Sequence, residues 1–155
     1  MINIVTLEGF KIKPKDFVEM IHFDERLPWV ENSNRSYNHL DLSRLKLSYL
    51  MDSWMDENDY SNFLEKYIKS TLDSCRKNQE TFVISTLSEL DFLVIRTIIK
   101  EDSKNRGGEI YCFGPDYDYK LNRYTIDVID INRDGNFVSR CELFNNFHKY
   151  HIRLI

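Results

Sequence analysis

The sequence lacks the residues and motifs that mark several common protein classes. It contains no alanine and only 5 glycines and 3 prolines, and none of its apolar runs is long enough for a transmembrane helix. Neither a Gly-rich phosphate loop nor a nucleophile elbow occurs, which disfavours a nucleotide-dependent enzyme. The N-terminus has no basic leader followed by a long apolar stretch, so the sequence predicts no secretory signal peptide.

Cysteine is also scarce and follows no recognised pattern. Cys75, Cys112 and Cys141 form no Cys-x-x-Cys pair, which predicts free thiols in a reducing cytoplasm and not a disulfide framework. His148 and His151 follow Cys141, but no second cysteine pair or His-Glu-x-x-His motif completes a zinc site. We therefore expect a cytoplasmic protein without a metal, a cofactor or catalytic residues.

The residues that are present predict a soluble globular chain. Its 155 residues fit a single domain, 1–155, and the 42% apolar and 14% aromatic residues can fill a core, which excludes disorder, collagen and coiled coil. The 25 acidic and 21 basic residues give a net charge of −4. This balance argues against direct binding of nucleic acid and permits attraction to basic partners. Without a membrane-spanning run, we expect no membrane partner.

The first part of the chain is expected to combine β structure with one short helix. Residues 2–13 alternate partly and predict a strand, or a small hairpin with its turn at Gly9. Pro14 suits the first position of a helix. The apolar face of this helix would hold Phe17, Met20 and Ile21. Residues 24–39 are rich in polar residues and predict a loop.

Two helices are predicted in the middle of the chain. Apolar side chains recur at helical spacing over residues 41–55 and predict the first. The second begins after an N-cap at Asp59. Its apolar positions continue for four turns and comprise Tyr60, Phe63, Leu64, Tyr67, Ile68, Leu72 and Cys75.

A strand and a third helix are expected next. Residues 81–87 are rich in β-branched side chains and predict the strand. The sequence Ser88-Glu89-Leu90-Asp91 has the form of a capping box, which favours a helix over residues 88–101. Because residues 92–99 are also rich in β-branched side chains, a second strand is the alternative for this segment.

The last third of the chain alternates apolar and polar residues. Strands are expected over residues 109–113, 123–132 and 137–144, and the Asp134-Gly135 pair suits a hairpin turn between the last two. Residues 130–135 also match the start of a Ca²⁺-binding loop, but its twelfth position is Cys141 and not glutamate. The whole pattern predicts an α+β fold with an N-terminal strand or strands, a short helix, central helices and a C-terminal antiparallel β-hairpin or sheet.

Two groups of residues are candidates for binding a partner protein. The first is Asp116, Tyr117, Asp118 and Tyr119, which we expect in a loop after a strand. Tyrosine supplies contact area at low entropic cost, and carboxylates pair with arginine. The second group lies at the junction of the two central helices and comprises Asp52, Asp56, Glu57 and Asp59. A plainer interpretation of both groups is that they are helix caps and solvated turns.

The chain resembles the small acidic bacterial immunity proteins, including those of contact-dependent growth-inhibition systems. The resemblance lies in size, acidity, the lack of catalytic motifs, the loop from Asp116 to Tyr119 and the coding bias. The absence of alanine, with 13 asparagines and 15 isoleucines, is typical of AT-rich DNA, which is often mobile. The resemblance implies a protein that blocks a cognate toxin, in particular a nuclease, by covering its basic active site with carboxylates and aromatic rings.

Two other functions fit the same sequence. A phage-encoded inhibitor of a bacterial defence complex would also use an acidic surface, directed against a channel that binds nucleic acid. A small metal-dependent or thiol-dependent enzyme would need a bound metal, or Cys112 or Cys141 as its reactive group.

Overall fold

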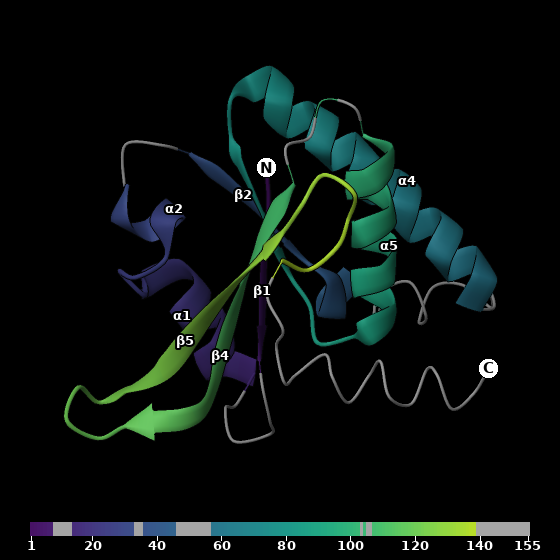
Figure 1. Ribbon diagram of the computed structural model, residues 1–155. Helices are drawn as coiled ribbons and strands as arrows, with labels where there is room; N and C mark the ends of the chain where they lie inside the picture. Colours follow the sequence, from purple (N-terminus) through teal and green to yellow (C-terminus); the bar gives the residue numbers. More distant parts are fainter. Residues whose placement is uncertain (8–13, 33–35, 46–56, 103, 105–106, 139–155) are drawn as a thin grey trace.

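The computed structural model describes residues 1–7, 14–32, 36–45, 57–102, 104 and 107–138. These residues form a five-stranded sheet with helices on both faces (Figure 1). The strands, in the spatial order β2-β3-β1-β4-β5, are β1 (Ile2–Leu7), β2 (Tyr37–Asp41), β3 (Thr81–Ser85), β4 (Gly108–Asp118) and β5 (Arg123–Ile131). β1 to β4 are parallel, and β5 is antiparallel to β4. The predicted α+β class with a C-terminal antiparallel hairpin is therefore confirmed.

The helices connect the parallel strands. α1 (Pro14–Phe23) and α2 (Pro28–Glu31) lie between β1 and β2, α4 (Glu57–Asn78) leads to β3, and α5 (Glu89–Glu101) leads to β4. α1 and α2 pack on one face of the sheet, and α4 and α5 pack on the other. The β1–β2 connection crosses the sheet in the opposite direction to the other two and on the opposite face. All three crossovers consequently have the same hand, as parallel sheets require.

A hydrophobic core forms on each side of the sheet because successive residues of a strand point to opposite faces. In β1, Ile2 and Ile4 belong to the core beneath α4 and α5. Val5 belongs to the core beneath α1 and α2, together with Trp29 of α2 and Phe113 of β4. The sequence predicts these strands from alternation and β-branched content. In the structure, the sheet contributes residues to both cores.

α4 confirms the second central helix, with two corrections. The helix starts at Glu57, so Asp59 lies within its first turn and is not the N-cap that the sequence predicts. The buried positions are Tyr60, Leu64, Ile68, Leu72 and Cys75. Tyr67 is 40% exposed, because only a narrow stripe of the helix meets the sheet and α5. The first central helix lies largely outside the described residues, which show its start at residues 42–45.

α5 settles the choice between helix and strand for its segment in favour of the helix. Ser88 is the N-cap as predicted, but its side chain makes no capping hydrogen bond. Its backbone N–H instead donates to the hydroxyl of Thr86 at 3.1 Å, and that hydroxyl donates to the buried carboxylate of Asp91 at 2.5 Å. The hydroxyl of Thr86, the residue directly after β3, therefore fixes the start of α5.

Two segments that the sequence predicts as loops form regular structure. Residues 24–39 include α2 and the first three residues of β2. β2 is a five-residue strand in which only Leu40 is buried, so it lacks the alternation that marks a strand in a sequence. Residues 114–118 belong to β4, because the ladder with β5 continues as far as Asp118. The loop expected after a strand is in fact the outer half of a hairpin.

The predicted Asp134-Gly135 turn is present after β5. Gly135 has a φ of 78°, which favours glycine, and its N–H donates to the carbonyl of Asn132 at 3.0 Å. Phe137 then forms an antiparallel bridge to the end of β5. The rest of the predicted return strand, with Cys141, lies outside the described residues, as does Gly9.

Candidate protein-binding site

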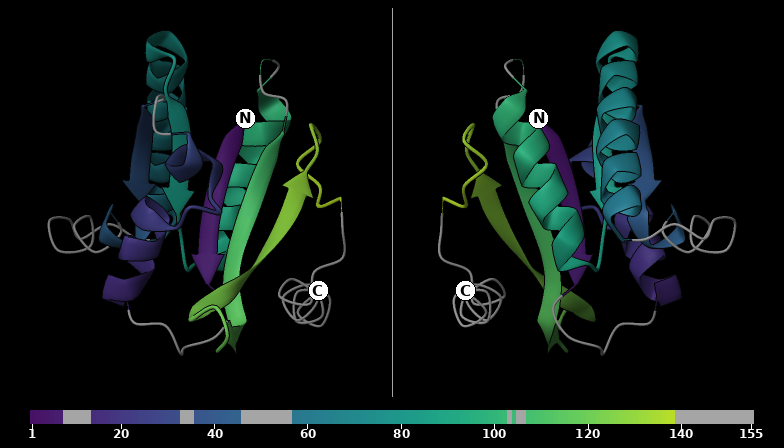
Figure 2. Two further views of the ribbon diagram at one scale, coloured as in Figure 1. Left: turned by 90° about the vertical axis from the view of Figure 1, so that its left-hand side faces the viewer. Right: turned by 90° about the vertical axis from the view of Figure 1, so that its right-hand side faces the viewer.

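The hairpin of β4 and β5 extends beyond the rest of the sheet. Among the described residues, β1 pairs with β4 as far as Leu7, which lies opposite Phe113. The ladder between β4 and β5 continues to the pair of Asp118 and Arg123, so the hairpin projects past the end of β1 (Figure 1). Figure 2 shows β5 crossing β4 as the two strands twist. We call residues 117–124 the hairpin tip.

A bulge in β4 marks the place where the hairpin leaves the sheet. Phe113 pairs with Ile126, and Tyr117 pairs with Tyr124. Between these two pairs, residues 114–116 of β4 lie opposite a single residue of β5, Thr125. Gly114 has a φ of 96°, and its carbonyl accepts a hydrogen bond from the Thr125 hydroxyl at 3.2 Å. Pro115 has no N–H to contribute to the ladder. The Gly114-Pro115 sequence therefore produces the bulge that redirects the strand.

The turn at the hairpin tip is built by Asp118. Its Oδ1 accepts hydrogen bonds from the backbone N–H groups of Lys120 at 2.9 Å and Leu121 at 3.3 Å. Asn122 completes the turn with a φ of 51°, a conformation that asparagine tolerates better than most residues. This carboxylate, which the sequence suggests as a group for partner binding, thus also has a role in shaping the turn.

Three tyrosine rings connect the core to the hairpin tip. Tyr124 is half-buried against the core beneath α1 and α2. Its ring centroid is 4.9 Å from that of Tyr117, which in turn is 5.1 Å from that of Tyr119, both in edge-to-face geometry. Tyr119 is 83% exposed and Leu121 is 57% exposed. The ring contacts hold the exposed end of the hairpin in an ordered arrangement.

The charges near the hairpin tip are balanced in the sequence. Asp116 and Asp118 are accompanied by one lysine and by Arg123. The charge of Arg123 also affects the pKa of Asp24, the residue that follows α1. Burial opposes ionisation of Asp24, but hydrogen bonds from Arg26, together with the charges of Arg26 and Arg123, lower its pKa. Exposed aromatic surface, more than net negative charge, therefore distinguishes the hairpin tip.

The second predicted group does not join the hairpin tip. Glu57 and Asp59 belong to the first turn of α4, which lies on the opposite side of the molecule from the hairpin tip (Figure 1). Asp52 and Asp56 lie outside the described residues. Asp59 is exposed, and a carboxylate in the first turn of a helix interacts favourably with the helix dipole. The described part of this group thus has a local structural explanation.

A polar cluster between α1 and the sheet was missed in the sequence. His22 of α1 and His39 of β2 have ring centroids 5.0 Å apart. The hydroxyl oxygen of Tyr37 lies 2.6 Å from Nδ1 of His22, and Oγ of Ser85 lies 2.7 Å from Nε2 of His39. We call these four residues the histidine cluster. They meet because alternate residues of β2 face α1. No strand pattern marks β2 in the sequence, so nothing there places His39 beside His22.

The environment of His39 favours its neutral imidazole. Burial lowers the pKa of His39, as does the neighbouring His22, whereas Asp41 partly opposes the shift. A serine hydroxyl bonded to an imidazole is the pairing that nucleophilic enzymes use. Ser85 is only 2% exposed, however, so a substrate could not approach its hydroxyl. The cluster links α1 to β2 and β3, and the burial of Ser85 disfavours this hydroxyl as a nucleophile.

The described thiols are also inaccessible. Cys75 and Cys112 are 2% and 1% exposed. Burial, with a smaller contribution from Glu80, raises the pKa of Cys75, whereas a reactive thiol needs a lowered one. Within the described ranges, no three His, Cys, Asp or Glu side chains gather as a metal site would require. A thiol-dependent reaction at these two cysteines is therefore disfavoured.

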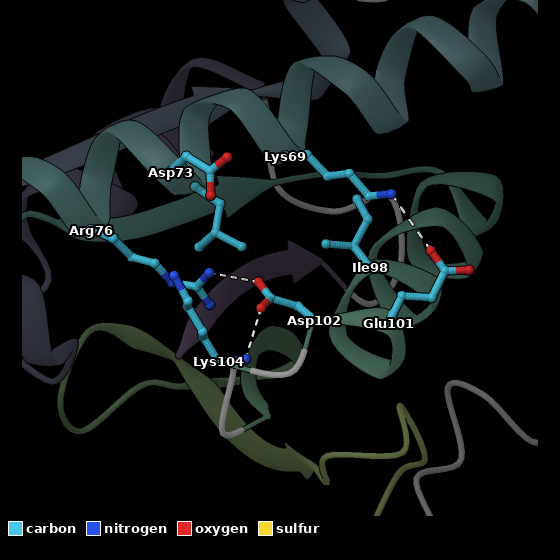
Figure 3. Close-up of a pocket in the computed structure, with 8 residues that line it drawn as sticks. Lys69, Asp73, Arg76, Ile98, Glu101, Asp102 and Lys104 are labelled. Atoms are coloured by element: carbon cyan, nitrogen blue, oxygen red, sulfur yellow. Dashed lines mark hydrogen bonds and ion pairs between the residues drawn. The ribbon is translucent and has the colours of Figure 1, made fainter.

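A cleft of about 310 Å³ lies between the last turns of α4 and α5 (Figure 3). Four of its charged side chains form two ion pairs: Nζ of Lys69 lies 3.5 Å from the Glu101 carboxylate, and Nη1 of Arg76 lies 2.7 Å from that of Asp102. Asp73 and Lys104 also line the cleft. Ile98 lines the cleft between the two pairs. Because the two ion pairs link α4 to the C-terminal end of α5, we assign the cleft a structural role in joining the two helices.

Two further observations bear on the choice of site. None of the helices in the described part of the chain has both the length and the apolar character needed to cross a lipid bilayer. The exposed side chains of Tyr119 and Leu121 make the hairpin tip our candidate for a binding surface. Comparison with known proteins found no family model that matches the chain, and no similar curated protein or solved structure.

Proposed function

We propose that the protein inhibits a bacterial toxin by binding it through the hairpin tip. The observation that carries the proposal is the exposure of two large apolar side chains, Tyr119 at 83% and Leu121 at 57%, at the end of a projecting hairpin. Burial of such side chains by a partner removes apolar surface from water, which is the main favourable term in protein association. Tyrosine is also among the residues that contribute most to binding energy at interfaces.

The order within the hairpin tip favours tight binding. The contacts of Tyr117 with Tyr124 and Tyr119 restrain the rings before a partner arrives. The hydrogen bonds of Asp118 likewise restrain the turn. Less conformational freedom is then lost on association, which improves affinity for the same buried area.

The inhibited toxin is expected to have a basic active site, as nucleases do. The net charge of −4 attracts a basic protein over a longer range than the contact itself, and this attraction accelerates association. A narrow projecting hairpin can enter a concave site, where a flat sheet face would not fit. Charge would thus speed the encounter, and the hairpin tip would supply the short-range contacts.

The experiment is a binding measurement with the product of the adjacent gene, produced in a catalytically inactive form. We expect a one-to-one complex by calorimetric titration, weakened by added salt. In the Tyr119→Ala/Leu121→Ala variant the complex should lose about 2 kcal/mol or more, roughly a thirtyfold weaker affinity. The matched control is Tyr67→Ala, which removes a 40% exposed ring from α4 and should leave affinity unchanged.

The outcomes separate the proposal from its alternatives. Equal affinity of the hairpin variant and the unmodified protein would place the interface elsewhere. A complex with a nucleic-acid-binding defence assembly, and none with a neighbouring toxin, would favour the phage-inhibitor alternative. The genes beside this one distinguish the two functions.

A further inference from the structure

A second cleft lies at the opposite end of β4 from the hairpin tip. It has a volume of about 320 Å³ and opens beside α2, where the first residues of β1, β3 and β4 come together. It is lined by Asn3, Trp29, Glu109 and Tyr111, and also by Met1 and Asn32, whose N–H groups are hydrogen-bond donors. We call it the Glu109 cleft.

Two oxygen acceptors of the Glu109 cleft have hydrogen-bonding capacity to spare. Asn3 is 8% exposed, and its Nδ2 donates to the carbonyl of Phe82 at 3.1 Å. No described residue donates to its Oδ1. The carboxylate of Glu109 accepts one short hydrogen bond, from the hydroxyl of Tyr111. Glu109 is only half-buried, and Oδ1 of Asn3 is not among the buried atoms without a partner. Both oxygens are thus open to a ligand that brings hydrogen-bond donors.

The carboxylate of Glu109 also lacks a cationic partner. Among the described residues its carboxylate makes no ion pair, unlike those of Asp24, Glu101 and Asp102. Asp130 of β5 lies directly opposite Glu109 in the antiparallel ladder and likewise has no ion pair in the described part of the chain. Like charges in this position repel one another. Burial, the Glu109 hydrogen bond and the charges of Glu109 and Asp130 raise the pKa of Tyr111, consistent with a negative potential there.

The apolar wall of the Glu109 cleft is rigid. Trp29 and Tyr111 are in edge-to-face contact, with centroids 5.2 Å apart, and are 3% and 4% exposed. The indole N–H of Trp29 donates to the carbonyl of Ile21 at 2.8 Å, which fixes the ring against α1. A preformed wall of this kind suits an organic ligand better than a hydrated metal ion, which needs several oxygen ligands.

We propose that the Glu109 cleft binds an organic cation, a guanidinium or primary ammonium group, with Glu109 as its charge partner and Asn3 as a further acceptor. Such a group has only donors, which matches the carboxylate of Glu109 and the Oδ1 of Asn3. The cation is either a free small molecule or an arginine or lysine side chain of a protein partner. The proposal depends on the cleft alone and is independent of the hairpin tip.

The test is an NMR titration of the ¹⁵N-labelled protein with N-acetylarginine amide. We expect saturable shifts of the Trp29 indole N–H and of the Asn3 side-chain amide. N-acetylcitrulline amide, which has the same shape without the charge, should cause no saturable shift. Calcium chloride at the same concentration should cause none either.

Two variants and one control identify the binding groups. Glu109→Gln should weaken binding by about tenfold, as expected for loss of a charged hydrogen-bond partner. Asp130→Asn, at an exposed position that leaves the fold unaffected, should weaken it by roughly threefold. Asp127→Asn removes the same charge from β5 at a residue of opposite orientation, and should leave binding unchanged. A saturable response to citrulline or calcium, or equal affinities in all three variants, would overturn the proposal.

The same variants distinguish the two sources of the cation. If a partner's side chain occupies the cleft, Glu109→Gln will weaken the complex with the adjacent gene product as well as the binding of N-acetylarginine amide. If a free small molecule occupies it, only the binding of the small probe will fall. The Tyr119→Ala/Leu121→Ala variant should bind N-acetylarginine amide normally in either case, so failure of the cleft proposal and failure of the hairpin proposal give different results.

Discussion

The two faces of the sheet are covered in different ways. On one face, α4 and α5 have 22 and 13 residues and bury a large apolar core. On the other, α1 and α2 have 10 and 4 residues and cover a smaller core. The histidine cluster, the Glu109 cleft and the anchor of the hairpin tip at Tyr124 all lie on this second face. The long helices therefore provide most of the stability, whereas the short helices leave room for polar groups and for recognition.

The largest effect should come from the α4–α5 face. Ile68 is fully buried, and Ile68→Ala should lower the free energy of unfolding by about 4 kcal/mol, because a cavity remains between α4, the sheet and α5. Ile21 of α1 is equally buried, but a short helix can shift to fill the space, so Ile21→Ala should cost about 2 kcal/mol. Urea denaturation measures both. Equal losses would show that the two faces are equally rigid.

A smaller effect is expected where α2 joins α1. Trp29→Phe removes the indole N–H that donates to the Ile21 carbonyl, and with it the bond that fixes α2 to the last turn of α1. The free energy of unfolding should fall by about 1.5 kcal/mol. The matched control is Phe23→Leu on α1, where the ring is 77% exposed. If both variants lose the same amount, α2 is held mainly by burial of the ring and not by the hydrogen bond.

The histidine cluster should make stability depend on pH. The pKa of His39 is lowered from 6.5 in the folded protein, so the folded state binds fewer protons than the unfolded state near that pH. The stabilisation is complete above pH 6.5 and is lost as the pH falls through the lower folded value. The groups that face His39 are His22, Tyr37, Asp41 and Ser85.

The test of this pH dependence compares the protein with His39→Gln. Urea denaturation at about pH 7.5 and about pH 5.5 brackets the usual range of histidine titration. We expect the variant to lose less stability on acidification than the unmodified protein does. Ile68→Ala should be less stable at both pH values while losing as much on acidification as the unmodified protein. An equal loss in His39→Gln would move the pH dependence to other groups.

Much of the fold could be predicted because its elements carry strong local patterns. α4 repeats apolar residues over several turns, and β1, β3 and β5 carry apolar residues that alternate or are β-branched. The order of the strands could not be predicted, because the parallel pairing of β1 with both β3 and β4 joins residues far apart in the sequence. The sequence does not predict β2, because four of its five residues are only partly buried and its polar side chains show no strand pattern.

The candidate site was predicted in part. The sequence suggests Tyr117, Asp118 and Tyr119 as candidates for partner binding by their types, and the structure places them at the end of the β4–β5 hairpin. Their role in binding stays a prediction. It could not show that Asp118 shapes the turn, because that role depends on backbone geometry. The Glu109 cleft was not visible at all, since Asn3, Trp29 and Glu109 come from three distant segments. Residue type can suggest a surface, but a cleft made by several elements requires the fold.

The smallest effect concerns Asp118 and separates its two roles. Asp118→Ala removes the acceptor for the Lys120 and Leu121 N–H groups and should lower the free energy of unfolding by about 0.5–1 kcal/mol. Asp118→Asn keeps an oxygen acceptor and removes the charge, so it should leave stability nearly unchanged. Calorimetric titration of both variants with the inactive partner then distinguishes the role of the Asp118 side chain in shaping the turn from the role of its charge. If Asp118→Ala weakens the complex and Asp118→Asn does not, the carboxylate acts by holding Tyr119 and Leu121 in position. Equal weakening in both variants would mean that the charge itself contacts the partner, as the acidic sequence of the hairpin suggests.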